Sequence, residues 1–167
     1  MNRPGPDYDV PEDLRFSYAQ IREAGGLVCE RRLETEPFKD ELEAPGRLLA
    51  LRVKLQFAVG TNNIYVEGTL TGRIKWSCSR CNRDFEQDFS QPFEELYPAG
   101  TELIDIMAQV RQALVLENDI SHLCAEECKG LCPLCGCDLN ERKCSCDRTP
   151  KLSPFGILKD KFSRKKD

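Results

Sequence analysis

The sequence predicts an α+β protein in which an antiparallel β-sheet is packed by one main helix and is followed by a small cysteine-rich module and a basic C-terminal tail. Long alternating runs of apolar and polar residues predict the sheet, and a later apolar stripe at helical spacing predicts the helix. Seven of the ten cysteines fall between Cys124 and Cys146, which predicts the module. The expected boundaries are 1–120 for the α+β domain, with 1–13 as a flexible arm, 121–147 for the module and 148–167 for the tail.

Length and composition limit the architecture to one sizeable core with a smaller module beside it, since 40% of the 167 residues are apolar. No run of about eighteen apolar residues occurs, so we expect no membrane partner. The first residues lack a basic segment followed by an apolar one, as a secretory signal would have. We therefore expect a cytoplasmic protein with reduced thiols.

The N-terminal third predicts short elements. Residues 14–26 are typical of a short strand followed by one or two helical turns that end at Gly25 and Gly26. Residues 27–34 predict a strand, in which Cys29 is an ordinary small buried residue.

The middle of the chain predicts a long antiparallel hairpin and a third strand. Apolar residues alternate with polar ones from Leu49 to Val59, and residues 60–63 are turn formers. A second alternating run follows, and its apolar face is made by Ile64, Val66, Leu70, Ile74 and Trp76. The third strand carries Phe85, Phe89 and Phe93.

The pair Cys78 and Cys81 is expected at the tip between the second and third strands. A thioredoxin-like redox pair instead sits at the N-terminus of a helix, whose dipole lowers the pKa of the attacking thiol. Nothing helical is predicted to begin at Ser79, so a redox role is the weaker interpretation.

The main helix is expected after Pro98-Ala99-Gly100. Thr101 is suited to cap it, and Glu102 and Asp105 would favour its first turn. Its core-facing stripe is made by Leu103, Ile106, Met107, Val110, Ala113 and Leu114.

Eight cysteines form four pairs, and we expect them to bind two structural Zn²⁺ ions. The segment C-P-L-C-G is typical of a zinc knuckle, in which amides point at the first sulfur and Gly136 adopts a backbone shape that other residues resist. Two thiols three residues apart share a metal more readily than they form a disulfide. The favoured partition joins Cys132 and Cys135 with Cys144 and Cys146, and Cys78 and Cys81 with Cys124 and Cys128.

Two further residues of the cysteine-rich region are expected to be non-ligands. His122 is the only histidine, and eight paired cysteines leave no vacancy for it. Cys137 would be the extra thiol, because the knuckle turn should point it away from the ion.

Charge alternates along the chain. Residues 47–82 carry six bases and one acid, whereas residues 83–127 carry two bases and eleven acids. The basic end is a candidate for nucleic-acid contact, although bases can also neutralise thiolates bound to zinc, or form solvated faces. The candidate residues are Lys129, Arg142, Lys143, Arg148, Lys151, Arg164, Lys165 and Lys166.

Several of these segments resemble the YceD family of large ribosomal RNA subunit accumulation proteins. The segment from Cys128 to Gly136, with Leu139-Asn140 and Cys144-Ser145-Cys146, is similar to the family signature. Further similarities are Cys78-Ser79-Arg80-Cys81 with Phe85, the segment from Ile104 to Leu116, and Pro154-Phe155 with Leu158.

The resemblance implies a ribosome-biogenesis factor needed for the accumulation of 23S ribosomal RNA, which binds metal and contacts RNA. Its partners would be large-subunit rRNA or its precursor particle, or a ribosomal protein, with no small-molecule substrate. We expect no enzymatic activity, because a hydrolytic zinc keeps an open position and draws on histidine or carboxylate ligands. A protein-binding adaptor and a thiol-redox or metal enzyme are the alternatives.

Overall fold

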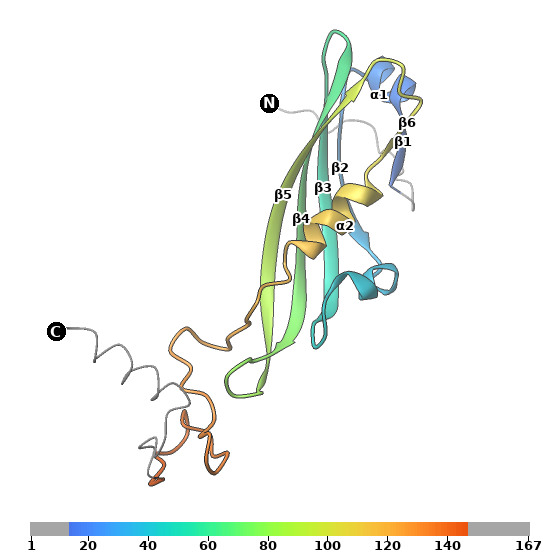
Figure 1. The fold of residues 1–167 in the computed structure, drawn as a ribbon. Helices are drawn as coiled ribbons and strands as arrows, with labels where there is room; N and C mark the ends of the chain where they lie inside the picture. The colour runs from blue at the N-terminus through green and yellow to red at the C-terminus, as the bar shows by residue number, and fades with distance from the viewer. Residues whose placement is uncertain (1–13, 147–167) are drawn as a thin grey trace, which may run out of the picture.

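The computed structural model describes residues 14–146 (Figure 1). Its main body is a four-stranded antiparallel sheet of order β2-β3-β4-β5, made by β2 (Leu27–Leu33), β3 (Arg47–Val59), β4 (Asn63–Ser77) and β5 (Asp84–Pro98). A second antiparallel sheet pairs β1 (Arg15–Ser17) with β6 (Leu103–Asp105). The helical segments are α1 (Tyr18–Ala24), the 3₁₀-helix η1 (Glu36–Glu41) and α2 (Met107–Val115).

The antiparallel sheet with helices agrees with the predicted α+β class. The helical residues are divided among three short segments, of which α2 is the longest with nine residues, so one main helix does not describe them well. The predicted arm (1–13) and the whole basic tail (148–167) fall outside the described residues. No helix in residues 14–146 is long and apolar enough to cross a membrane.

One face of the large sheet holds the core. The predicted apolar face of β4 is buried from Ile64 to Trp76, and helices α1, η1 and α2 contribute to the same cluster. Gly68 and Gly72 lie on this face, opposite Phe93 and Phe89 of β5. A Cβ at Gly68 would lie 2.0 Å from the Phe93 ring, so each glycine makes room for an aromatic ring that fills the layer.

A β-bulge changes the predicted alternation of β3. The pairing with β4 shifts between Leu48 and Ala50, so Leu48 and Leu51 are both buried while Leu49 is exposed. Period-two alternation alone had placed Leu49 on the buried face with Leu51.

The helix expected from Thr101 begins later. Leu103–Asp105 instead forms β6, which pairs with β1 almost ninety positions earlier in the chain. Helix α2 then starts at Met107, whose backbone N–H donates to Asp105 Oδ1 over 2.9 Å. The prediction was wrong at this end because its strand partner is distant in sequence.

Candidate metal centres

The turn between β4 and β5 presents Cys78 and Cys81 from the tip of the long hairpin. The Cys78 N–H donates to the Arg83 carbonyl over 2.9 Å, and the Asn82 N–H donates to the Cys78 carbonyl over 2.9 Å. Asn82 has a φ of 56°, a left-handed shape that asparagine tolerates better than most residues. The turn therefore places both thiols at the tip between β4 and β5, where the sequence predicted them.

Cys124 and Cys128 approach this tip from the segment that follows α2. The Sγ atoms of Cys78 and Cys128 are 3.8 Å apart, and those of Cys81 and Cys124 are 3.6 Å apart. All four Sγ atoms lie within 4.8 Å of one another. We call this set the first quartet.

A second quartet is made by Cys132, Cys135, Cys144 and Cys146, whose Sγ atoms also lie within 4.8 Å of one another. The Gly136 N–H donates to the Cys132 carbonyl over 2.8 Å and closes the predicted knuckle turn, with Gly136 at a φ of 69°. The Cys144 sulfur lies 3.5 Å from that of Cys135 and 3.4 Å from that of Cys132. The structure thus groups the four pairs as the favoured partition did.

The geometry of both quartets fits Zn²⁺. Four sulfurs about 2.3 Å from a tetrahedral zinc would be separated by roughly 3.8 Å, which is close to the separations in both quartets. A disulfide would need sulfurs about 2.0 Å apart. All ten cysteines lie in the described part of the chain, and all ten are free thiols there. The two quartets are therefore groups of cysteines that could hold metal ions.

Backbone N–H groups favour a thiolate in both quartets, at Cys78 in the first and at Cys144 and Cys135 in the second. Burial raises the pKa of Cys78, but N–H groups of Cys124, Arg80 and Cys81 outweigh it and lower the pKa to about 6. The Cys146 N–H, 3.3 Å from Cys144 Sγ, is the largest cause that lowers the pKa of Cys144 to about 6. Each quartet is thus prepared to present a metal ligand in its charged form.

One other thiol in each quartet resists ionisation because a neighbouring thiol lies against it. Contact with the Cys81 thiol, followed by burial, raises the pKa of Cys124 to about 12. Contact with the Cys144 thiol does the same to Cys146, whose pKa is raised to about 12. A divalent cation at the centre would remove this opposition by attracting all four sulfurs, so the donor set fits a metal better than four free thiols.

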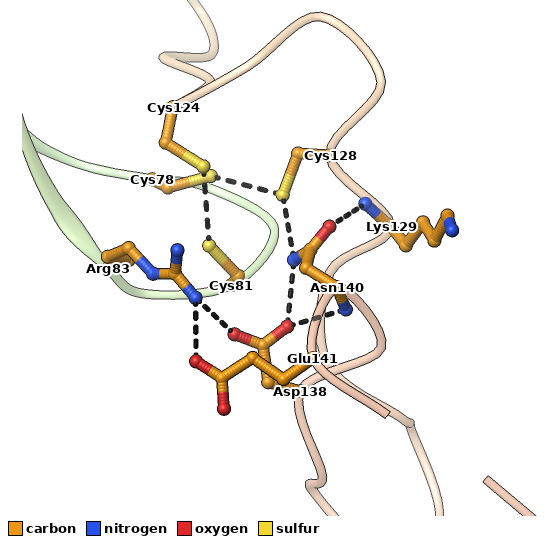
Figure 2. Close-up of polar contacts among 9 residues, drawn as sticks. All are labelled: Cys78, Cys81, Arg83, Cys124, Cys128, Lys129, Asp138, Asn140 and Glu141. Atoms are coloured by element: carbon orange, nitrogen blue, oxygen red, sulfur yellow. Dashed lines mark hydrogen bonds and ion pairs between the residues drawn. The ribbon is translucent and has the colours of Figure 1, made fainter. Parts of the chain in front are cut away.

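The first quartet also joins the hairpin tip to the second quartet's segment (Figure 2). Asn140 Nδ2 lies 3.5 Å from Cys128 Sγ, and its Oδ1 accepts from the Lys129 N–H over 2.8 Å. Arg83 at the tip pairs with Asp138 at 2.9 Å and Glu141 at 3.0 Å. The Asn140 N–H, followed by its side chain and Arg83, lowers the pKa of Asp138.

The hairpin tip and the segment after Cys128 are also in close backbone contact. The Leu131 N–H donates to the Arg80 carbonyl over 3.1 Å, and Arg80 Nη1 donates to the Cys128 carbonyl over 2.9 Å. Gly130 has a φ of 72°, and a Cβ there would lie 2.9 Å from the Arg80 carbonyl oxygen. A glycine at this position therefore allows the two segments to meet.

His122 lies beside the first quartet and is not one of its four residues. Its ring stacks on Trp76, with ring centroids 3.5 Å apart and planes 11° from parallel. The His122 N–H donates to Ser79 Oγ, and the Ser79 N–H donates to the His122 carbonyl. The contact links the sheet to the cysteine-rich segment, which the sequence did not predict because a lone histidine carries no partner signal.

Cys137 and Cys29 differ in detail from their predictions. Cys137 is buried, and contact with the Cys135 thiol, followed by burial, raises its pKa to about 11. Cys137 is not one of the four residues of the second quartet, but its thiol lies against that of Cys135 instead of pointing away. Its carbonyl accepts from the Cys132 N–H over 2.8 Å and so lies within the knuckle turn. Cys29 is half-buried on β2, and burial raises its pKa to about 11.

Replacement of His122 by alanine should change the fluorescence of Trp76, the only tryptophan of the chain. The imidazole covers the indole, so its loss should shift the emission to longer wavelength and cost about 0.5–1.5 kcal/mol of stability. Emission spectra and chemical denaturation would measure both effects. The control is His122→Phe, which keeps a ring on Trp76; an unchanged spectrum for His122→Ala would contradict the stacking.

The predicted nucleic-acid residues are placed only in part. Lys129, Arg142 and Lys143 are exposed around the second quartet. Arg148, Lys151, Arg164, Lys165 and Lys166 lie outside the described residues.

The C-terminal part of the chain matches a known protein family. Residues 97–160 match the model of the family described as large ribosomal RNA subunit accumulation protein YceD. The family resemblance predicted from the sequence is confirmed. The matched segment contains six of the eight quartet cysteines, and Cys78 and Cys81 lie before it.

Two plant relatives named large ribosomal RNA subunit accumulation protein YCED homolog 1, chloroplastic, are similar to the chain. The Arabidopsis thaliana protein is 38% identical over 72 residues, which are 41% of this chain and 22% of that protein. The Zea mays protein is 36% identical over 84 residues, which are 47% of this chain and 28% of that protein. The match thus spans about a quarter of each relative's length, and no solved structure matches the chain significantly.

Proposed function

We propose that this chain is a non-catalytic ribosome-biogenesis factor needed for the accumulation of large-subunit, 23S, ribosomal RNA. It holds two structural zinc ions and contacts the rRNA or its precursor particle. The observation that carries the proposal is the match of residues 97–160 to the YceD model, in a segment whose cysteines gather into quartets.

The donor chemistry supports a structural role for the metal. A zinc bound by four thiolates has no open position for water or substrate, whereas hydrolytic zinc sites keep one and use histidine or carboxylate ligands. The zinc would instead stabilise a segment with little regular structure, in which the described residues after α2 form one isolated β-bridge, Leu131 with Asp138.

RNA contact is proposed for the basic residues around and after the second quartet. Lys129, Arg142 and Lys143 are exposed there, and the basic residues from Arg148 to Lys166 follow in the sequence. Four thiolates and one zinc carry a formal charge of −2, so part of this positive charge balances the metal centres. The remainder would meet phosphates of the RNA backbone.

Sedimentation would test the proposed function. The tagged protein should sediment with large-subunit precursor particles, and ribonuclease treatment should release it to the top of the gradient. An equally tagged unrelated protein of similar size and charge is the control for trapping. Co-sedimentation that survives complete RNA digestion would identify a protein-held adaptor and contradict RNA contact, and absence from precursor particles would contradict the function itself.

A further inference from the structure

The sheet face opposite the core collects the basic residues of the middle of the chain. Residues 47–82 carry six bases, and five of them project from this open face of β3 and β4. These five are Arg47, Arg52, Lys54, Arg73 and Lys75, and Arg32 of β2 lies on the same face opposite Arg52. The same face also carries acids, which are Glu30 on β2, Glu67 on β4, and Asp84, Glu86, Asp88 and Glu94 on β5. The first three acids of β5 pair with Arg73 or Lys75. The excess of positive charge therefore lies on the β2–β3 half of the face, where Arg32, Arg47, Arg52 and Lys54 are opposed by Glu30.

On this face, two pairs of directly opposite residues on neighbouring strands carry like charge. Arg32 is directly opposite Arg52, and Arg47 is directly opposite Lys75. Like charges at such positions destabilise a sheet, whereas a pair of opposite charge would stabilise it by a few tenths of a kcal/mol or more. Arg52 also pairs with Glu30 at 2.7 Å and Lys75 with Asp84 at 2.8 Å, which offsets part of this repulsion. Of the four residues in these two pairs, those without such an ion pair within residues 14–146 are Arg32 and Arg47.

A shallow hollow of about 590 Å³ lies at the centre of this face. Arg32, Arg52 and Arg73 line it together with Asp88, the partner of Arg73, and the small residues Ala50 and Thr71 lie between the arginines. A large side chain at Ala50 or Thr71 would fill the space between the guanidinium groups. The hollow is therefore open to a ligand that can accept hydrogen bonds from several arginines.

The three arginines differ in whether their guanidinium groups already pair with a carboxylate of the protein. Arg73 pairs with Asp88 through two bonds, of 2.7 and 3.1 Å, and Arg52 pairs with Glu30 at 2.7 Å. Arg32 is exposed and makes no ion pair within residues 14–146. Its planar, always charged guanidinium is suited to bidentate contact with a phosphate.

We propose that this hollow is a second RNA contact, which binds phosphates of the RNA backbone through Arg32 and Arg52. The inference rests on the proposed function and adds a surface that lies on β2 and β3. Phe89 is the one aromatic residue among those that line the hollow, and it is buried with its ring against Gly72 on the core side of the sheet. It is therefore not available for base stacking, and the contact would depend on backbone phosphates instead of base identity. Lys54 is two residues after Arg52 on β3, so it lies on the same face and extends the row of basic side chains.

Arg32→Gln tests the proposal because it separates binding from folding. The change removes a phosphate contact and also relieves the repulsion with Arg52, so RNA affinity should fall while thermal stability stays equal or rises. With a large-subunit rRNA transcript as the probe, the slope of log K against log salt should fall by about 0.7–0.9, and by about twice that for Arg32→Gln with Arg52→Gln. Arg22→Gln, in α1, removes an equal charge elsewhere and should leave the slope unchanged.

The outcomes distinguish this inference from the proposed function. If the native protein sediments with precursors in a ribonuclease-sensitive manner but Arg32→Gln leaves the salt slope unchanged, the hollow is not an RNA contact and the function stands. If the native protein does not bind the transcript, the inference fails, and absence from precursor particles as well would make the proposed function fail with it. A second probe, poly-glutamate of matched charge, decides the partner class: tighter binding of the polypeptide, lost in Arg32→Gln, would overturn the RNA assignment.

Discussion

Cys128→Ser should remove one of two zinc ions and release the cysteine-rich segment from the hairpin tip. Cys128 is buried in the first quartet, where its sulfur lies 3.8 Å from Cys78 Sγ and 3.5 Å from Asn140 Nδ2. Structural zinc contributes about 10–16 kcal/mol to the folding of small zinc modules, so this substitution should have the largest effect of any single change at the site. Elemental analysis should fall from two zinc ions per chain to one.

Trp76 provides a second readout of the same event. Its ring is covered by His122, only two residues before Cys124 of the first quartet. Loss of the first zinc should therefore change Trp76 emission, whereas Cys135→Ser, which removes the second zinc, should leave the emission near that of the native protein. Cys29→Ser, on β2 and outside both quartets, should retain both metals. Two zinc ions bound to Cys128→Ser, with native emission, would refute the assignment.

The sequence allowed the hairpin and the quartets to be predicted because both depend on local patterns. Alternation from Ile64 to Trp76 specifies the buried face of β4, and Cys-x-x-Cys spacing specifies a knuckle whatever lies around it. The grouping of the cysteine pairs into quartets could also be inferred. The two pairs from Cys132 to Cys146 lie within fifteen residues and can share one ion, which leaves the pair of Cys78 and Cys81 to combine with that of Cys124 and Cys128.

The contacts that could not be predicted join residues far apart in the chain. Leu103–Asp105 is a strand because Arg15–Ser17 is available to pair with it, and His122 stacks on Trp76 because the first quartet brings them together. The like-charge pair of Arg32 and Arg52 likewise depends on the register between β2 and β3. Such contacts have no signature in a window of neighbouring residues, since they depend on which elements meet.

The sheet and the second quartet are stabilised by different interactions, so their stabilities should depend on different conditions. The sheet is stabilised by a buried apolar layer, whereas the segment from Cys132 to Cys146 has few buried apolar residues and gathers around sulfurs. Stability of the first would follow core packing, and stability of the second would follow metal supply. A core substitution can separate the two.

Leu70→Ala should destabilise the sheet by about 2–5 kcal/mol while the second quartet keeps its zinc. Leu70 is fully buried at the centre of β4, where its loss would leave a cavity in the layer between β3 and β5. Denaturation followed by circular dichroism would give the stability, and a chromogenic chelator would follow zinc release in the same titration. Zinc from the second quartet should leave in a separate step at higher denaturant than the sheet transition.

Thr69→Ala is the matched control for this experiment. Thr69 is the preceding residue on β4 and faces the open side of the sheet, so its replacement should change stability by less than about 0.5 kcal/mol. The spacing between the two zinc-release steps should widen in Leu70→Ala and stay constant in Thr69→Ala, because only the first substitution weakens the core. Release of both metals together with the sheet signal in every variant would instead show one cooperative unit, in which the quartets depend on the same core.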